Sequence, residues 1–374
     1  MVLKLKTNNF KNRSRFKDFV IFIYKIFQFL QILIATFFKP ISKSISVYYG
    51  GSFTGDIGGP LVKRKRLNKY FPENKFSFNI VYLLSNANYL NKYSIDYLKI
   101  KKKPIILNQN GVYYSAWYKG DWKKKNLIMS YSYNLADYVF WQSAFCRKMA
   151  DQYLGKREGP GEILFNAVDT KKDFFPIKKK YQNLFTFLIT GKFDINMFYR
   201  LESSLKGLAI ANKEGIQCKL KIAGWMHHEI KANLIYLVER LNLNQLVDIT
   251  GPFNQLNARK IYQSADAYLI TKCLDPCPNV VIEAMSCGLP ILYSNSGGIP
   301  ELVTNNCGVS LDLPKSNINN LSTPEPQVIA EGMDTIIKSH KIMAINSRLR
   351  AIEQFEISNW ICRHEKVFSI FLKN

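Results

Sequence analysis

The stretch that decides the fold is DPCPNVVIEAMSCGLPILYSNSGGIPELV, which occupies residues 275–303. It predicts a proline-rich turn, a helix, a short apolar strand and a Gly-Gly turn that opens another helix. The prolines favour extended backbone, so Asn279 and Val280 lie near the start of the first helix, whose free N–H groups can bind a phosphate. Glu283 follows about one turn later, placed to accept hydrogen bonds from vicinal hydroxyls such as those of a ribose. A purely structural alternative is that the carboxylates of this stretch only cap and solvate the helix.

Short β-rich runs alternate with amphipathic stretches on both sides of this segment. The runs are mostly apolar on both faces, as expected of buried parallel strands. Two βα arrays of this kind predict an α/β fold with two doubly wound sheets, whose ligands bind beyond the carboxyl ends of the strands. The expected strands are 44–50, 76–84, 104–111, 137–143 and 162–168 in the first array, and 184–191, 217–224, 246–251, 266–270, 289–294 and 308–313 in the second.

Composition bounds the class of protein. The chain has 374 residues, 47% of them hydrophobic and 21% charged, so it can form sizeable cores and is not disordered as a whole. Its net charge of +24 is concentrated in residues 1–180, which hold 33 basic and 11 acidic side chains. This asymmetry indicates an acidic partner, either nucleic acid or an anionic membrane surface, unless lysine-rich coding accounts for it. Seven cysteines, an odd number, are typical of reduced thiols in a cytosolic protein.

The first 44 residues form a basic, amphipathic segment. Six basic side chains between residues 1 and 17 precede the apolar run 19–38. At 100° per residue, the polar side chains of this region form one stripe along a helix. Three arrangements stay open: a helix lying in a membrane interface, which the stripe favours, a membrane-spanning helix, or a helix packed on its own protein. The stripe comprises Lys17, Asp18, Tyr24, Lys25, Gln28, Gln31, Thr36 and Lys39.

The signature in residues 275–303 resembles that of family 4 of the retaining, nucleotide-sugar-dependent glycosyltransferases, or glycosyl transferases group 1. Asp275 and Glu283 fill its two acidic positions, separated by seven residues, and the GGIPE turn with Gly297 and Gly298 follows. The resemblance implies the GT-B architecture, in which two Rossmann-like domains face a cleft. It places the acceptor in an N-terminal domain and the donor in a C-terminal one. The expected divisions are 1–44, 45–180, 184–345 and a returning helix at 346–374, with 169–183 as the linker.

The resemblance also assigns further positions. Lys192 matches a basic residue after the first C-domain strand, and Arg200 is the best match for a second one, both against the donor diphosphate. Gly224 and Gly251 match turns near the nucleotide base. Three glycines of the loop after the first strand, Gly55, Gly58 and Gly59, correspond to the family's glycine-rich loop that faces donor and acceptor, and Asn110 is expected to hydrogen-bond the sugar.

Two departures from the family pattern matter for the mechanism. The hallmark usually begins with Glu, so Asp275 has a shorter reach. Many relatives have a histidine near the position of Asn110, whereas all four histidines here lie in the second half of the chain, which excludes an N-domain imidazole as general base. The helix expected after the glycine-rich loop carries five cations between residues 63 and 69, too many for a buried face. It is predicted either to be solvated or to contact acidic headgroups or a pyrophosphate-linked acceptor.

The sequence therefore predicts a membrane-associated, cytoplasm-facing retaining glycosyltransferase. It would move a sugar from a UDP- or GDP-sugar to a glycan or lipid-linked acceptor in bacterial surface polysaccharide or glycolipid synthesis. No DxD motif occurs, so neither a metal nor another cofactor is expected. One alternative keeps the fold for a nucleotide-sugar epimerase or a phosphorylase. The other is a non-enzymatic basic protein that binds nucleic acid, which is disfavoured because no recognition motif with stacking aromatics is present.

Overall fold

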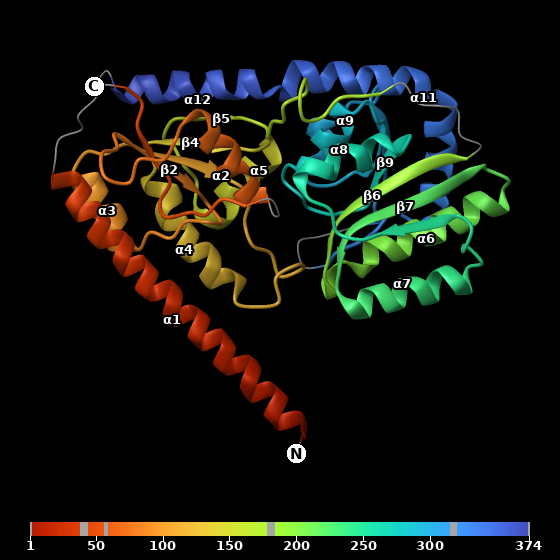
Figure 1. Ribbon diagram of the computed structural model, residues 1–374, viewed down its shortest axis with the longest axis horizontal. Coiled ribbons are helices and arrows are strands. Elements are labelled where there is room, and N and C mark those ends of the chain that lie inside the picture. Colours follow the sequence, from red (N-terminus) through yellow and green to blue (C-terminus); the bar gives the residue numbers. More distant parts are fainter. Residues whose placement is uncertain (1, 38–43, 56–58, 178–183, 315–319, 373–374) are drawn as a thin grey trace.

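The computed structural model describes residues 2–37, 44–55, 59–177, 184–314 and 320–372. The expectations for Gly58 and for residues 178–183 of the linker lie outside this range. Two α/β lobes stand side by side, and a pair of helices near the C-terminus runs along both of them (Figure 1). Each expected β-rich run overlaps a strand.

The N-terminal lobe is built on a five-stranded parallel sheet. Its strands follow one another in chain order, and alternate side chains point to opposite faces, both of which are buried. Helices α1 (Val2–Phe37), α3 (Lys92–Ile100), α4 (Trp122–Leu135) and α5 (Ala144–Leu154) cover one face, while α2 (Gly59–Tyr70) and α12 (Ile357–Leu372) cover the other. The strands are β1 (Val47–Tyr48), β2 (Ile80–Leu84), β3 (Ile105–Gln109), β4 (Tyr138–Trp141) and β5 (Gly161–Ile163).

The C-terminal lobe has a six-stranded parallel sheet in the order β11-β10-β9-β6-β7-β8. The first strand, β6 (Phe185–Phe193), is central, and the chain adds strands first on one side of it and then on the other. This doubly wound order creates a switch point between β6 and β9, where ligands bind in such folds. The other strands are β7 (Cys218–Met226), β8 (Val247–Thr250), β9 (Ala267–Ile270), β10 (Ile291–Ser294) and β11 (Gly308–Leu311).

Helices cover both faces of this second sheet as well. One core cluster joins the sheet to α6 (Phe198–Lys213), α7 (His228–Arg240) and the first part of α11 (Pro326–Phe355). The other joins it to α8 (Gln255–Gln263), α9 (Asn279–Ser286), α10 (Ile299–Leu302) and the end of α11. A single 3-10 turn, η1 (Ile195–Met197), precedes α6. Helix α9 is therefore fixed by the core, with its N-terminus directed at the space between the lobes.

The chain returns to the N-terminal lobe at Glu356, where α11 ends and α12 begins. This residue has extended backbone, with φ −66° and ψ 132°, so the helix axis breaks there. The neighbouring backbone pairs with Val168: its N–H donates to Phe355 O at 3.0 Å, and Ile357 N donates to Val168 O at 3.0 Å. The Glu356 carboxylate accepts from the Thr170 N–H at 3.1 Å. Helix α12 then lies over the N-terminal lobe (Figure 1).

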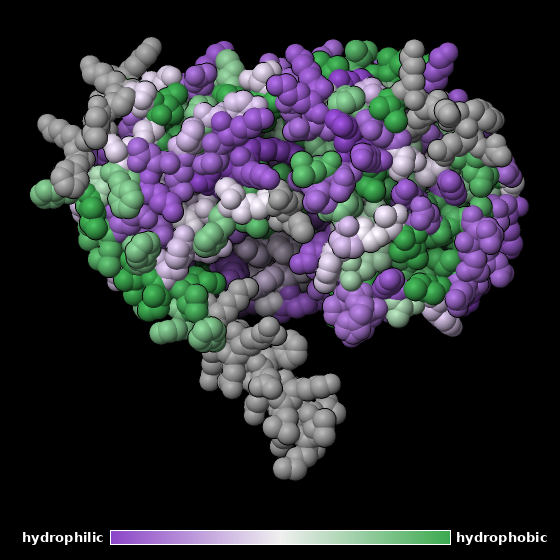
Figure 2. Space-filling model, viewed as in Figure 1, coloured by the Kyte–Doolittle hydropathy of each residue, from purple (hydrophilic) through white to green (hydrophobic). Residues whose placement is uncertain are grey.

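Helix α1 extends diagonally from the N-terminal lobe, and its N-terminal end projects away from the body (Figure 1). Three polar side chains of its stripe face the protein. Tyr24 Oη donates to Gly51 O and Gln31 Nε2 to Lys75 O, both at 2.9 Å, while Gln28 is hydrogen-bonded to Tyr48. Apolar side chains from Phe16 to Phe37 are left exposed on the outside of the helix, and they form a green margin in Figure 2.

A buried histidine makes the docking of α12 sensitive to acid. His364 is fully buried, with Nε2 2.8 Å from Tyr82 Oη and Nδ1 2.8 Å from Trp360 O. A carbonyl oxygen only accepts, so Nδ1 donates and Nε2 accepts from the tyrosine, which is the neutral form of the ring. Burial, reinforced by Lys63, lowers the pKa of His364 to about 3 despite the hydrogen bond to Trp360.

We predict that His364→Gln reduces the loss of stability in acid. A base with a lowered folded-state pKa stabilises the fold above its unfolded pKa, near 6.5, and that contribution is lost as pH falls from there toward 3. By linkage the loss reaches about 2 kcal/mol at pH 5. Thermal unfolding at pH 7.5 and pH 5 should show a smaller difference for His364→Gln than for the wild type. His228→Gln, at an exposed histidine, should behave as the wild type; equal acid sensitivity of all three would contradict the assignment.

Candidate functional site

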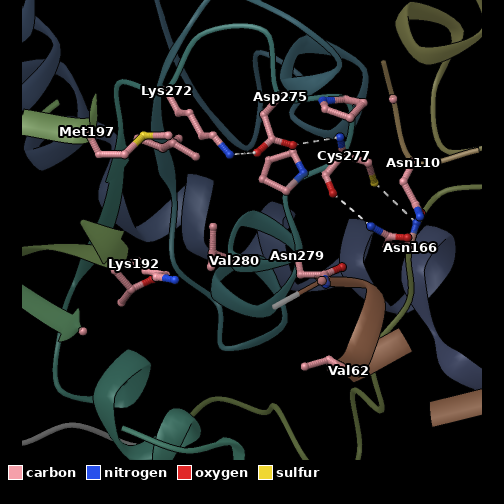
Figure 3. A pocket seen from close by; sticks show the side chains of 18 of the residues that line it. Val62, Asn110, Asn166, Lys192, Met197, Lys272, Asp275, Cys277, Asn279 and Val280 are labelled. Carbon is pink, nitrogen blue, oxygen red and sulfur yellow. Dashed lines mark hydrogen bonds and ion pairs between the residues drawn. The ribbon is translucent and has the colours of Figure 1, made fainter. Parts of the chain in front are cut away.

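The two lobes enclose one cavity of about 570 Å³ at the carboxyl ends of their central strands. It opens as a hollow between the lobes in Figure 2, and Figure 3 shows side chains that line it. Seven of the residues expected at the site line this cavity together: Lys192, Arg200, Gly224, Asp275, Asn279, Val280 and Glu283. Gly59 and Asn110 line it from the N-terminal lobe.

Two cations of the C-terminal lobe face the cavity at the end of β6 and the start of α6. Lys192 is exposed there, with its Nζ 5.1 Å from the centre of the Trp225 ring. Arg200 is 4% exposed, its guanidinium lies 5.4 Å from the Phe193 ring centre, and its buried Nε has no hydrogen-bond partner. A buried donor without a partner is costly in a folded protein, and an anionic ligand would satisfy it.

Glu283 lies on α9 and contacts both lobes. Its Oε2 accepts from Tyr262 Oη at 2.9 Å, and its Oε1 forms an ion pair with Arg66 Nη2 of α2 at 3.1 Å. Arg66 also donates to Ala167 O at 2.7 Å. Burial raises the pKa of Glu283, and the Arg66 guanidinium opposes that increase. Glu283, the residue expected to bind a ribose, therefore lines the cavity and also joins the two lobes.

Asp275 occupies a turn in which both carboxylate oxygens have partners (Figure 3). Oδ2 accepts from Lys272 Nζ at 2.6 Å, and Oδ1 accepts from the Cys277 N–H at 3.1 Å. The main-chain carbonyl of Asp275 accepts from Gly298 N at 2.9 Å. The turn is thus fixed from behind, and Lys272 brings a further cation to the lining of the cavity.

The glycines expected at the donor site have different roles. Gly224, at φ +137°, lies so close to β6 that a Cβ would be 1.9 Å from Gly191 O, so the strands can approach at the cavity floor only with glycine here. Gly297 and Gly298 do not line the cavity; a Cβ on either would collide with the backbone of residues 275–276. They support the Asp275 turn. Gly251 does not line the cavity either, because it is exposed beyond the end of β8.

In the N-terminal glycine-rich loop, Gly59 faces the start of α9, and an added Cβ would lie 3.8 Å from Asn279 Nδ2. Gly55 does not line the cavity, because it packs on Leu61, whose carbonyl accepts from the Gly55 N–H at 3.3 Å. Among the aromatic side chains of the next loop, Tyr114 and Trp117 line the cavity.

The expectation that the cations of α2 are too numerous for a buried face is wrong. Lys63 and Arg64 are 5% and 3% exposed. Each has neighbours that compensate for lost hydration: Lys63 Nζ donates to Asn108 Oδ1 at 2.7 Å, and Arg64 pairs with Glu73 at 3.1 Å. The Arg64 guanidinium also lies 3.7 Å from the centre of the Tyr49 ring. These partners come from separate segments, so the charge pattern of α2 alone did not reveal them.

Sequence reasoning missed several polar residues of the site. Lys63 precedes the buried Leu67 by four residues, which puts the lysine on the inward face of α2; this spacing was the available signal. No local signal identified the amides of Gln142 and Asn166, which follow strands β4 and β5 and line the cavity. Asn166 Nδ2 donates to Cys277 O at 2.9 Å, which links the N-terminal lobe to the Asp275 turn (Figure 3).

Two facing Rossmann-like lobes with a cation-lined cavity between them define a protein of the GT-B type, and the comparisons agree. HepE of Anabaena in complex with UDP superposes with a TM-score of 0.67, at 14% identity, over 87% of this chain and 100% of that one. Sucrose-phosphate synthase of Thermosynechococcus elongatus superposes with a TM-score of 0.62, at 16% identity, over 85% and 83% of the two chains. The expected fold class is confirmed.

Residues 170–354 match the family model described as "Glycosyl transferases group 1". The match covers the C-terminal lobe and nearly all of α11. An uncharacterized glycosyltransferase of Methanocaldococcus jannaschii is 25% identical over 158 residues, or 41% of this chain and 38% of the relative. The alignments span less than half the length of the curated relatives, 38% of one and 47% of another.

We predict that Arg66→Met destabilises the protein by about 3 kcal/mol, because it leaves the buried Glu283 carboxylate without its cation. Without Arg66 the pKa of Glu283 rises further. A carboxyl whose folded pKa exceeds its unfolded pKa destabilises the fold above the folded pKa, and this penalty is relieved as pH falls through it.

Denaturant unfolding of Arg66→Met at pH 8 and pH 5 measures this effect. The deficit relative to the wild type should be smaller at pH 5. Lys69→Met changes an exposed cation of the same helix and should cost little at either pH. A similar loss of stability in Arg66→Met and Lys69→Met, or a deficit of Arg66→Met that grows in acid, would argue against the ion pair of Arg66 and Glu283.

Proposed function

We propose that this protein is a retaining family 4 glycosyltransferase that transfers a sugar from a UDP- or GDP-sugar to a glycan or lipid-linked acceptor in bacterial surface polysaccharide or glycolipid synthesis. One observation carries the proposal: Lys192, Arg200 and Glu283, from three elements of the C-terminal lobe, line one cavity. Two cations suit a diphosphate and the carboxylate suits a ribose, as the signature implies. The complex of HepE with UDP supports a uridine nucleotide as the first candidate.

The residues of the site support transfer with retention of configuration. Lys192 and Arg200 would stabilise the charge that develops on the nucleoside diphosphate as the bond from sugar C1 to the β-phosphate oxygen breaks. The acceptor oxygen bonds to C1 on the same face, and its proton passes to the departing phosphate oxygen. This route needs no imidazole on the N-terminal wall. Positioning of the two substrates in the cavity is then the main contribution of the protein.

The acceptor would enter from the N-terminal lobe. Asn110 and Gln142 present carboxamides to the cavity, and Tyr114 and Trp117 present aromatic rings. Amides donate and accept hydrogen bonds with sugar hydroxyls, and aromatic rings pack on the apolar faces of sugars. This lining is consistent with a carbohydrate acceptor.

We predict that Glu283→Gln lowers kcat/KM for donor turnover by at least about 10²-fold while the fold is retained, because the amide cannot replace a charged acceptor for the ribose hydroxyls. Incubation with UDP- and GDP-sugars labelled in the sugar measures turnover and identifies the product. A glycosylated acceptor or slow hydrolysis fits a transferase, whereas epimerised sugar or sugar phosphate would replace that assignment. Glu239→Gln, on the exposed surface of α7, is the control. Normal turnover by Glu283→Gln would remove this residue from the site.

We further propose that the protein acts at the cytoplasmic face of the plasma membrane through α1. Residues 19–37 of this helix are long and apolar enough to cross a membrane, and 22% of them are buried in the protein. Tyr24 and Gln31 of the polar stripe contact the N-terminal lobe, whereas Phe19, Phe22, Phe27 and Leu30 are each more than half exposed. A row of exposed aromatic and aliphatic side chains beside a basic segment is suited to an anionic lipid surface.

We predict that Phe27→Glu weakens binding to phosphatidylglycerol-containing vesicles by at least about tenfold, since a carboxylate replaces apolar surface and repels anionic lipid. Leu256→Glu, which changes an 89% exposed leucine of α8, should bind as the wild type does. Co-sedimentation with anionic and neutral vesicles at two salt concentrations measures the apolar and the electrostatic contributions to binding. Equal binding of the two variants would argue against α1 as the membrane contact.

A further inference from the structure

We propose that Lys63 binds the diphosphate of the donor from the N-terminal wall of the cavity, opposite Lys192 and Arg200. The inference rests on the proposed function, since it assumes a nucleotide-sugar donor. It adds a residue that the glycosyltransferase signature does not include. It also makes the leaving group a ligand of both lobes.

The surroundings of Lys63 are those of a cation without a counter-ion. Its Nζ donates to two neutral carboxamide oxygens, Asn108 Oδ1 at 2.7 Å and Asn110 Oδ1 at 3.0 Å. Within the described residues no carboxylate forms an ion pair with it. An ammonium has three donors, so one N–H is left for a ligand. Because Lys63 is 5% exposed yet lines the cavity, bulk water does not compensate its charge.

A second buried cation lies across the same cavity. Arg200 is 4% exposed and has an unpartnered Nε. The two carboxylates of the lining are already engaged, Asp275 by Lys272 and Glu283 by Arg66. An anion between the walls would supply the missing partner of Lys63 and Arg200 at once. A diphosphate, with its several oxygens, can accept hydrogen bonds from more than one cation.

Two helix N-termini meet at this place. Helix α2 begins at Gly59 and α9 at Asn279, and an ideal Cβ on Gly59 would be 3.8 Å from Asn279 Nδ2. Each N-terminus carries a partial positive charge and free N–H groups, which favour phosphate. Lys63 lies in the second turn of α2, directly behind this junction. The two helix N-termini and the Lys63 ammonium together favour a phosphoryl oxygen over a neutral hydroxyl as the ligand of Lys63.

Burial lowers the pKa of Lys63 to about 7, with a smaller contribution from Arg66. The groups that face it from other elements are neutral near pH 7: burial raises the pKa of Cys146 on α5 and of Cys277 to about 12, and lowers that of His364 on α12 to about 3. Arg66 is a fixed cation. Lys63 is therefore the group of this set that changes charge near neutrality, and an anion bound beside it will draw a proton onto it.

Calorimetric titration of the full chain with UDP-glucose tests the proposal. Its diphosphate diester does not titrate near pH 7, so proton uptake reports on the protein. Measured at pH 7 in two buffers of different ionisation enthalpy, the wild type should take up as much as about half a proton. Its affinity should fall as pH rises from 6 to 8.5. Lys63→Gln should abolish the uptake, weaken binding by about 10- to 100-fold and remove the pH dependence in that range, whereas Lys69→Gln should match the wild type.

The outcomes separate this inference from the proposed function. Binding of UDP-glucose by the wild type without proton uptake, or with equal affinity in Lys63→Gln, would overturn the role of Lys63 and leave the donor site intact. If Lys63→Gln binds the donor normally but transfers sugar slowly, the role of Lys63 at the diphosphate is also overturned, because the lysine would then serve the acceptor. Failure of the wild type to bind either UDP-glucose or GDP-mannose would refute the proposed function together with this inference. The wild-type uptake is decisive even where Lys63→Gln does not fold.

Discussion

The buried carboxylate of Glu283 is the point on which the arrangement of the two lobes depends. It receives one hydrogen bond from its own lobe, through Tyr262, and one ion pair from the other, through Arg66. A carboxylate buried in this way is tolerated only with such partners, so α9 and α2 are held at a fixed separation. The N-termini of both helices face the cavity as a result. The same group that suits a ribose hydroxyl thus also sets the width of the cavity in which the ribose would lie.

The fold followed from the sequence because its signal is local and repeated. Parallel strands covered on both faces produce short apolar runs, and each strand of the described residues overlaps one of the runs so expected. The C-terminal half of the site was also predictable, since Asp275, Asn279 and Glu283 follow one another within a single strand–turn–helix unit. The N-terminal half was not. Lys63 donates hydrogen bonds to Asn108 and Asn110, which lie 45 and 47 positions further along the chain. Arg66 donates to Glu283 across a separation of 217 positions.

Helix α1 shows the same limit in another form. Its amphipathic pattern correctly indicated two faces, but a period of 3.6 residues does not say which face meets the protein. In the structure the polar stripe is used by Gly51, Lys75 and Tyr48 of the N-terminal lobe, and the apolar side is outside. This is the reverse of a helix that packs on a soluble core. The exposed row of aromatic and aliphatic side chains on α1 would therefore be stabilised by contact with another apolar surface.

The charge asymmetry of the chain and the charge of the cavity have different origins. Residues 1–180 hold most of the net +24, yet cations of the cavity come from both lobes, with Lys192, Arg200 and Lys272 on a lobe whose overall excess is small. What makes the cavity electropositive is the pairing of its acids: Asp275 is engaged by Lys272 and Glu283 by Arg66, so neither carboxylate is free to neutralise Lys63, Lys192 or Arg200. Because these three cations lie on opposite walls, a bound diphosphate would neutralise both lobes at once. Donor binding would then favour the same arrangement of the lobes that Arg66 and Glu283 maintain.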